Sequence, residues 1–229
     1  MDSEIPLSGA NWAANSEAYA ALVAEHLNPK SLWLDAGCGR RLLEDDMDPL
    51  EEWLVAHCGA IFGMDPALTH HRNIRLLVQG ALDALPFADG SLDLITCNMV
   101  AEHLDDPGKS FGEVARCLRT LGVFIVKTPN LLNYGVMGNA VASKVMPEKW
   151  RLRLVKGSDD RAPEGFFPVR YKANTMRRLE RLMQRSGLQV HKAVALPQRR
   201  PFFRKTGKLE RFLMKLTPTS SLLVCAHKL

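Results

Sequence analysis

Two aspartates stand where short apolar runs end, with a glycine-rich turn between them. In "LWLDAGCGR", three apolar residues lead into Asp35, and Gly37 and Gly39 follow. A second run, "AIFGMD", ends on Asp65. Glycine lets the backbone turn sharply and approach a ligand closely, and open α/β sheets bind ligands at the carboxyl ends of their strands. The pattern therefore predicts a ligand site built from two carboxylates and a glycine turn.

The carboxylates narrow the class of ligand. "GCGRRL" lacks the third glycine of a dinucleotide-binding loop, and no G-K-[ST] follows to make a P-loop. Asp35 would repel a pyrophosphate, but it suits a ligand with an ammonium or sulfonium group. Asp65 is placed to accept hydrogen bonds from both ribose hydroxyls of an adenosine. S-adenosylmethionine has all of these groups. The alternative for each acid is a cap on the following helix, which the Asp65-Pro66 pair also fits.

Apolar runs and helical segments alternate through the first 130 residues. We expect helices over about residues 16–27, 48–58 and 107–118, and we expect strands over residues 32–35, 60–65, 74–80, 91–98 and 121–130. Such alternation indicates a doubly wound, parallel α/β sheet. A further helix is expected within "NTMRRLERLMQRSGL", capped by Asn174 or Thr175, and two late strands within "QVHKAVALP" and "SSLLVCAHKL".

The motifs together resemble a known family. "LDAGCG", "GMD", "ALDALPFADGSLDLITCNMVAEHL" and "LGVFIVKTPN" look like class I S-adenosylmethionine-dependent methyltransferases over residues 30–130. "VRYKANTMRRLERLMQRSGLQV" is similar to the segment after the variable insert in bacterial members. The resemblance implies a Rossmann-like sheet of seven strands with the last strand antiparallel. It also implies one domain over residues 1–229, with a cap inserted at residues 131–170 between strand 5 and the next helix.

The resemblance assigns site residues by position. Asp35, Gly37, Cys38 and Gly39 match the first motif, which lines the methionine end of the cofactor, and Asp65 matches the acid that binds the ribose. Residues after the third strand flank adenine, and the end of the fourth strand passes beneath the sulfonium. The residues that flank adenine are Ala81, Leu82 and Asp83, and those beneath the sulfonium are Asn98 and Met99.

The chain departs from the family pattern at two turns. Arg41 stands in place of the third glycine of the first motif, and "LRTLGVF" replaces the usual Pro-Gly-Gly turn before the fifth strand. These departures are the reason for keeping, as an alternative, a catalytically silent binding module that retains the fold.

His103, in "AEHL", is the candidate general base, because its intrinsic pKa suits proton transfer near neutral pH. The similar "EH" of quinone-biosynthesis O-methyltransferases belongs to a metal site, but its additional acids are absent here, so we predict no metal. The alternative is that Glu102 and His103 cap or pack the following loop.

Acceptor specificity is expected in the second half of the chain. Asn130, Asn133, Tyr134 and Trp150 are polar or aromatic candidates for binding the substrate, although the first three could instead close a turn. Residues 1–130 carry a net charge of −10 and residues 131–229 one of +15. Within the basic half, "GKLERFLMKL" predicts an amphipathic helix that either lies on an anionic membrane or covers the sheet. Nucleic acid is disfavoured, because no RNA-binding signature accompanies the charge.

Composition favours a cytoplasmic protein. No signal peptide or membrane span is evident, and the five cysteines lack C-x-x-C spacing, which indicates reduced, mostly buried thiols and does not suggest zinc. Together with the site residues and the resemblance, this composition leads us to expect a cytoplasmic methyltransferase that uses S-adenosyl-L-methionine as its cofactor. The expected reaction is O-methylation of a small molecule or of a sugar-containing, lipid-linked metabolite. The alternatives are the silent module and an RNA methyltransferase that uses the basic half.

Overall fold

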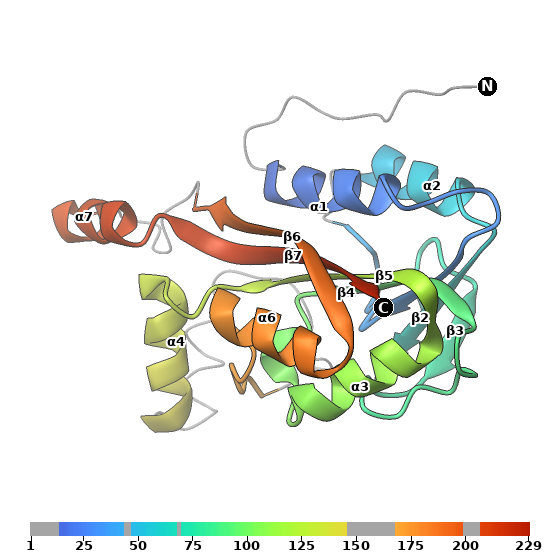
Figure 1. Ribbon diagram of the computed structural model, residues 1–229. Helices are drawn as coiled ribbons and strands as arrows, with labels where there is room; N and C mark the ends of the chain where they lie inside the picture. Colours follow the sequence, from blue (N-terminus) through green and yellow to red (C-terminus); the bar gives the residue numbers. More distant parts are fainter. Residues whose placement is uncertain (1–13, 44–46, 68–69, 146–167, 199–206) are drawn as a thin grey trace.

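A computed structural model describes the chain except for residues 1–13, 44–46, 68–69, 146–167 and 199–206 (Figure 1). The strands are β1 (Leu32–Ala36), β2 (Ala60–Asp65), β3 (Leu76–Gln79), β4 (Leu92–Asn98), β5 (Leu118–Pro129), β6 (Leu188–Pro197) and β7 (Thr219–Lys228). The helices are α1 (Ala14–Ala24), α2 (Asp48–Ala56), α3 (Pro107–Cys117), α4 (Tyr134–Val145), α6 (Met176–Arg185) and α7 (Lys208–Leu216), with a 3₁₀ turn at Ala101–His103.

All seven strands form one sheet in the order β3-β2-β1-β4-β5-β7-β6. The first five strands are parallel, whereas β7 runs antiparallel to both of its neighbours, β5 and β6. This arrangement confirms the expected seven-stranded sheet with its antiparallel last strand. Because β1, β2 and β4 are parallel neighbours, Asp35, Asp65 and Asn98 come to the same edge of the sheet.

Helices cover both faces of the sheet, with α1 and α2 on one side and α3 and α6 on the other (Figure 1). One apolar cluster joins Tyr19 and Leu54 of α1 and α2 to Trp33 of β1. The other joins Phe111 of α3 and Leu179 of α6 to the opposite face. Burial of these apolar faces drives the two-sided packing.

The start of β5 differs from the expectation. The strand begins at Leu118 rather than near residue 121, and its register against β4 shifts between Leu92 and Leu94. Leu121 adopts a left-handed conformation with φ of 63°. Gly122 follows, where an added Cβ would lie 2.8 Å from the carbonyl oxygen of Arg119. The chain therefore makes an irregular bulge where the family pattern has a glycine turn.

The amino end of α6 also differs from the expected capping. Thr175 occupies the N-cap position, but neither its side chain nor that of Asn174 caps the helix. The side-chain amide of Asn174 instead donates to Thr128 Oγ1 at 2.7 Å and to the Pro129 carbonyl at 3.1 Å. Asn174 therefore joins the segment before α6 to the carboxyl end of β5.

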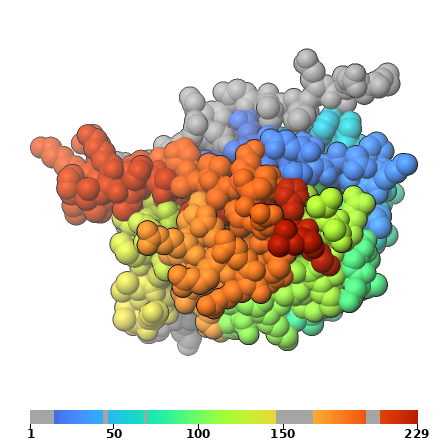
Figure 2. Space-filling view, in the orientation of Figure 1, coloured from blue at the N-terminus to red at the C-terminus, as the bar shows by residue number. Residues whose placement is uncertain are grey.

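Two helices at the carboxyl end of β5 leave apolar side chains exposed. α4 lies within the predicted cap and exposes Met137 and Val141, while α7 projects from the body of the molecule and exposes Leu209 and Phe212 (Figure 2). The amphipathic pattern of α7 thus does not result in an apolar face packed on the sheet. None of the helices in the described ranges has the length and hydropathy needed to span a bilayer.

Candidate active site at the carboxyl edge of the sheet

The glycine turn after β1 is held tightly against the neighbouring strands. Gly37 and Cys38 donate their backbone N–H groups to the Met64 carbonyl at 2.6 and 3.1 Å. Gly37 has φ of 79°, and a Cβ added there would lie 2.2 Å from Val100 Cγ2. Gly39 has φ of 53° with open space beside its Cα. The first glycine is therefore required by packing, and the second leaves the backbone open to a ligand.

Asp35 is a buried carboxylate at the carboxyl end of β1, with 3% of its surface exposed. Its Oδ1 accepts a hydrogen bond of 2.7 Å from Thr96 of β4, and Thr96 in turn accepts one of 2.8 Å from the Trp33 indole. Burial raises the pKa of Asp35 to about 7, the Thr96 hydrogen bond lowers it, and the carboxylates of Glu51 and Asp65 raise it. A cation beside Asp35 would favour its ionised form.

Asp65 connects the end of β2 to the glycine turn. Its Oδ2 accepts from the Gly39 N–H at 3.2 Å, and its Oδ1 accepts from the Ala67 N–H at 2.9 Å. The second bond is a local turn of the type weighed as the alternative for this acid. The first bond connects the two predicted acids through the glycine turn, because it holds the Asp65 carboxylate against the turn that follows Asp35.

Glu51 holds the segment after the glycine turn, a role that the sequence pattern did not predict. It lies on α2 with 1% of its surface exposed. Its Oε2 accepts from the backbone N–H groups of Leu42 and Leu43 at 3.1 and 3.0 Å, and its Oε1 accepts from Asn73 at 2.8 Å. The stretch "DPLEEWLVA" did hold a signal for this role, because Glu51 lies on the same helix face as the apolar residues Leu50 and Leu54.

Asn98, at the end of β4, reaches the same segment. Its side-chain amide donates to the Leu42 carbonyl at 3.2 Å. Among the described residues, its buried Oδ1 has no hydrogen-bond partner. A buried acceptor without a donor is costly, so an N–H or O–H group of a ligand would stabilise this position. The next residue, Met99, is exposed and has φ of 59°.

The predicted adenine-side residues lie in a turn after β3. Ala81 and Ala84 form an isolated bridge, and Leu82 is buried. Asp83 Oδ2 lies 3.3 Å from Lys109 Nζ of α3, so its carboxylate is already engaged in an ion pair. Cys38 is buried and its thiol pKa is raised to about 12, primarily by burial, so it acts as an apolar group.

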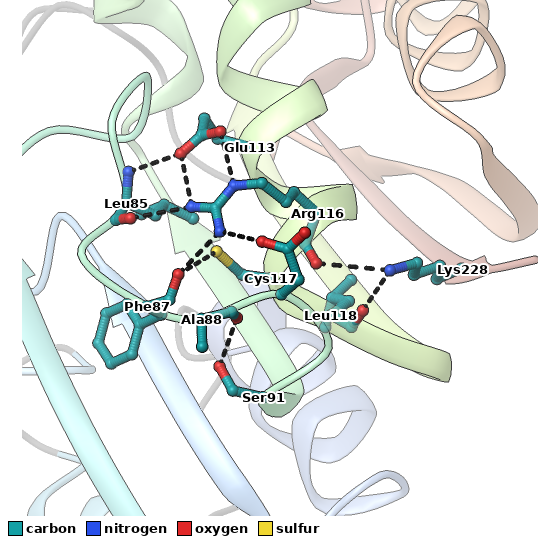
Figure 3. Close-up of polar contacts among 10 residues, drawn as sticks. Leu85, Phe87, Ala88, Ser91, Glu113, Arg116, Cys117, Leu118 and Lys228 are labelled. Atoms are coloured by element: carbon teal, nitrogen blue, oxygen red, sulfur yellow. Dashed lines mark hydrogen bonds and ion pairs between the residues drawn. The ribbon is translucent and has the colours of Figure 1, made fainter.

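Arg116 of α3 fixes the loop that continues from this turn (Figure 3). Its guanidinium donates to the carbonyls of Leu85 and Phe87 and to the carboxylates of Asp89 and Glu113, at 2.6 to 3.0 Å. Hydrogen bonding to Arg116 lowers the pKa of Glu113 to about 2. The sequence pattern did not predict this network, because Leu85, Phe87 and Asp89 lie 27 to 31 residues from Arg116 in the chain.

His103 lies in the 3₁₀ turn after β4 and is partly exposed. Its Nδ1 is 3.3 Å from the Pro168 carbonyl, and its Nε2 is 4.0 Å from Glu102 Oε1. A carbonyl only accepts, so this contact assigns the proton of the neutral ring to Nδ1 and leaves the lone pair on Nε2. Glu102 is buried and accepts from Thr128 at 3.0 Å, and burial raises its pKa.

The predicted substrate residues after β5 are largely engaged with the protein. Asn130 donates to Thr219 at 2.8 Å, and the carbonyl oxygen of the Asn133 side chain accepts from Gly135 at the start of α4. The Tyr134 hydroxyl donates to Glu210 Oε1 at 2.7 Å. These contacts agree with the turn-closing alternative, while Trp150 lies outside the described residues.

A hollow of about 300 Å³ lies beside the glycine turn. Four basic side chains line it: Arg40, Arg41, His70 and Arg72. The hollow suits an anionic group of a ligand. Arg41, which replaces a glycine of the family pattern, therefore contributes to a lined cavity next to the turn.

Replacing Asp35 with Asn should stabilise the folded chain more at pH 8 than at pH 5. Because the native pKa of Asp35 exceeds the ordinary value of 3.8, the native state binds more protons than the unfolded state between these values, and stability falls as pH rises to about 7. The pKa of Asp35 rises from 3.8 in the unfolded chain to about 7 in the folded chain. The increase in the free energy of unfolding caused by Asp35→Asn should therefore be roughly 2–3 kcal/mol larger at pH 8 than at pH 5.

Urea unfolding at both pH values measures this difference. Asp89→Asn is the control, because Asp89 is an exposed acid whose removal should change stability by less than about 1 kcal/mol at either pH. An Asp35→Asn gain that is the same at pH 5 and pH 8 would contradict the assignment.

Comparison with known proteins finds similarity to methyltransferases over the first part of the chain. A family model described as "Methyltransferase domain" matches residues 34–126, which run from β1 through most of β5. The uncharacterized methyltransferase YcgJ of Bacillus subtilis is 46% identical over 48 residues, which cover 21% of this chain and 19% of that protein. The malonyl-[acyl-carrier protein] O-methyltransferase of Hahella chejuensis is 34% identical over 98 residues, covering 42% and 35%.

Solved structures extend the likeness to nearly the whole chain. The YcgJ crystal structure covers 93% of this chain and 98% of its own, with a TM-score of 0.59 and 17% identity. Geranyl diphosphate C-methyltransferase from Streptomyces coelicolor, solved with S-adenosyl-L-homocysteine, covers 93% and 77% with a TM-score of 0.57 and 17% identity. The chain shares the fold of these structures. It spans less than two fifths of the length of the two curated relatives. The chain thus matches a methyltransferase domain over residues 34–126 and shares the fold of these solved structures.

Proposed function

We propose that the chain transfers a methyl group from S-adenosylmethionine to a hydroxyl group of an acceptor with an apolar portion. The observation that supports it best is the bond from the Gly39 N–H to Asp65, which joins the glycine turn and both strand-end acids in one site. Within the described part of the chain, the Oδ1 of Asn98 has no hydrogen-bond partner and no heavy atom lies within 4 Å of a Cβ added at Gly39, and both observations fit a ligand at this edge. The basic hollow beside the turn is a further place for an anionic group.

The protein residues have separate roles in this proposal. S-adenosylmethionine supplies a methyl group on a sulfonium, so the leaving group is already activated. Asp35 favours the cationic methionine end, and Asp65 accepts from ribose hydroxyls. Ala81 and Leu82 flank the adenine, and Glu51 keeps the backbone of Leu42 and Leu43 in place. Much of the rate then comes from holding donor and acceptor in line.

His103 is the proposed general base. A hydroxyl acceptor must lose its proton as the oxygen attacks, and the lone pair on Nε2 can take it. The Pro168 carbonyl holds the proton on Nδ1, and the buried Glu102 lies 4.0 Å from Nε2, where it stabilises the imidazolium that forms. His103 stands just after β4, whose end carries Asn98.

The exposed apolar side chains of α4 and α7 support an acceptor with a lipid portion. α4 follows β5 and α7 precedes β7 at the edge where Pro129 pairs with Ser221. Leu209, Phe212 and Leu216 of α7 are more than half exposed, with Lys208 and Arg211 nearby on the same helix. Such a helix suits contact with an anionic membrane in which a lipid-linked acceptor lies.

Asp65→Asn should weaken the binding of S-adenosylhomocysteine about tenfold or more. The wild-type chain is expected to bind with a Kd in the micromolar range, about −8 kcal/mol, and the neutral amide loses charge-assisted acceptance from the ribose hydroxyls. Calorimetric titration measures both values, with Asp89→Asn as the control that binds like wild type. A folded wild-type chain that does not bind would favour the silent-module alternative.

His103→Ala should lower turnover about 100-fold or more, as expected for loss of a general base. The Kd for S-adenosylmethionine should change less than about twofold. The assay follows transfer of a labelled methyl group to a panel of free and lipid-linked sugars. Wild-type-like turnover in the variant would remove His103 from the mechanism.

A further inference from the structure

Three of the seven histidines gather around a buried cysteine on the α1 side of the sheet. His26 follows the end of α1, His191 lies in β6, and Cys225 and His227 lie two residues apart in β7. Cys225 pairs with Ile125 and His227 with Val123, near the middle of β5. The proposed active site lies at the ends of β1, β2 and β4, so β5 separates the two groups of residues across the sheet.

The ligand atoms of this cluster lie within the reach of one ion. One donor atom from each of His26, His191 and Cys225 lies within 4.8 Å of the other two. Cys225 Sγ and His26 Nε2 are 3.5 Å apart. A tetrahedral zinc ion with bonds of about 2.3 Å to sulfur and about 2.0–2.1 Å to nitrogen holds such a pair about 3.5 Å apart. The distance between these two atoms already fits zinc.

A β-bulge brings His191 into the cluster. The pairing of β6 with β7 shifts between Val190 and Lys192, so His191 is the extra residue of the bulge. Bulges redirect a side chain and are frequent beside functional sites. Without the shift, alternation along the strand would place this side chain differently relative to Cys225. The irregularity in β6 thus has an explanation in the position of one imidazole.

His227 and an ion pair lie beside the three ligand residues. His227 lies against His191 with ring centroids 4.3 Å apart, and 5.7 Å from His26. The nearby charges of Glu25 and Lys192 pair with each other at 3.2 Å. His191 is exposed and His26 half-buried, so an ion can enter from solvent, while Cys225 is buried.

We propose that His26, His191 and Cys225 bind a zinc ion. Nitrogen and sulfur ligands in this number are typical of zinc. On binding, the Cys225 thiol releases its proton to solvent and coordinates as the thiolate. The ion would connect the end of α1 to β6 and β7. α1 also contacts the active-site side through Ser16, which accepts from Lys127 at 3.2 Å, so the ion would fix the helix at its other end.

Metal titration of the full chain tests this site. After chelator treatment and removal of the chelator, ZnCl₂ is titrated by calorimetry, and CoCl₂ is titrated by absorption. We expect one equivalent of each metal, a thiolate-to-cobalt charge-transfer band in the near ultraviolet, and a rise in the thermal unfolding midpoint with zinc. Cys225→Ser and His191→Ala should each weaken zinc binding about 100-fold or more. Loss of a residue that only hydrogen-bonds to a metal ligand already lowers metal affinity about 10- to 100-fold, so loss of a ligand itself should lower it at least as much.

Cys58→Ser is the matched control, because Cys58 lies outside the cluster, where its thiol donates to the Val55 carbonyl. It should bind zinc like wild type. His191 is exposed, so His191→Ala tests the site even if the core substitution Cys225→Ser does not fold. A folded wild-type chain that binds no zinc, a cobalt complex without the thiolate band, or unchanged affinity in His191→Ala would overturn the proposal.

Discussion

The carboxylate of Asp35, buried at the end of a parallel strand, is the constraint on which the candidate active site depends. The groups that act on it electrostatically are themselves acids, Glu51 and Asp65, and its direct partner is the neutral hydroxyl of Thr96. An arrangement of three acids at one edge is unfavourable for the protein alone, because burial penalises the charged form. It becomes favourable when a cationic ligand lies beside it.

The surrounding structure keeps this edge in one geometry. Gly37 has no room for a side chain against Val100, so β4 and the turn after β1 pack closely. Glu51 and Asn98 both bind the segment at Leu42, one from α2 and the other from β4. Arg116 of α3 likewise holds the loop after β3 in place, by donating to its backbone carbonyls. Helices on both faces therefore act on the loops as well as on the core.

The order of strands and helices could be read from the sequence, because strands buried on both faces are short apolar runs and helices between them have clear boundaries. Pro107 with Asp106, whose side chain accepts from the Lys109 N–H at 3.1 Å, is one such boundary. The convergence of Asp35 and Asp65 also followed, since parallel neighbours end at the same edge. The assigned roles of the site residues stay predictions.

Other features could not be read from the sequence, because they depend on contacts between distant segments. Glu51, Thr96 and Arg116 are ordinary polar residues until the fold places backbone groups around them. The spacing of the cysteines did not suggest zinc, since the ligands now proposed at His26, His191 and Cys225 come from three separate elements. The exposed apolar side of α7 was equally hidden, because an amphipathic pattern does not say which surface it meets.

The most direct test of this account is the affinity for S-adenosylmethionine as a function of pH. Asp35 has a pKa of about 7 before binding, and a cationic ligand binds to its ionised form. The affinity for this ligand should therefore rise roughly tenfold per pH unit below pH 7 and change little above it. Calorimetry between pH 5.5 and 8 should show this rise in the wild type and a flat profile in Asp35→Asn. A rise that persists in Asp35→Asn, or tight binding by the wild type that does not depend on pH, would contradict the central role of the buried carboxylate.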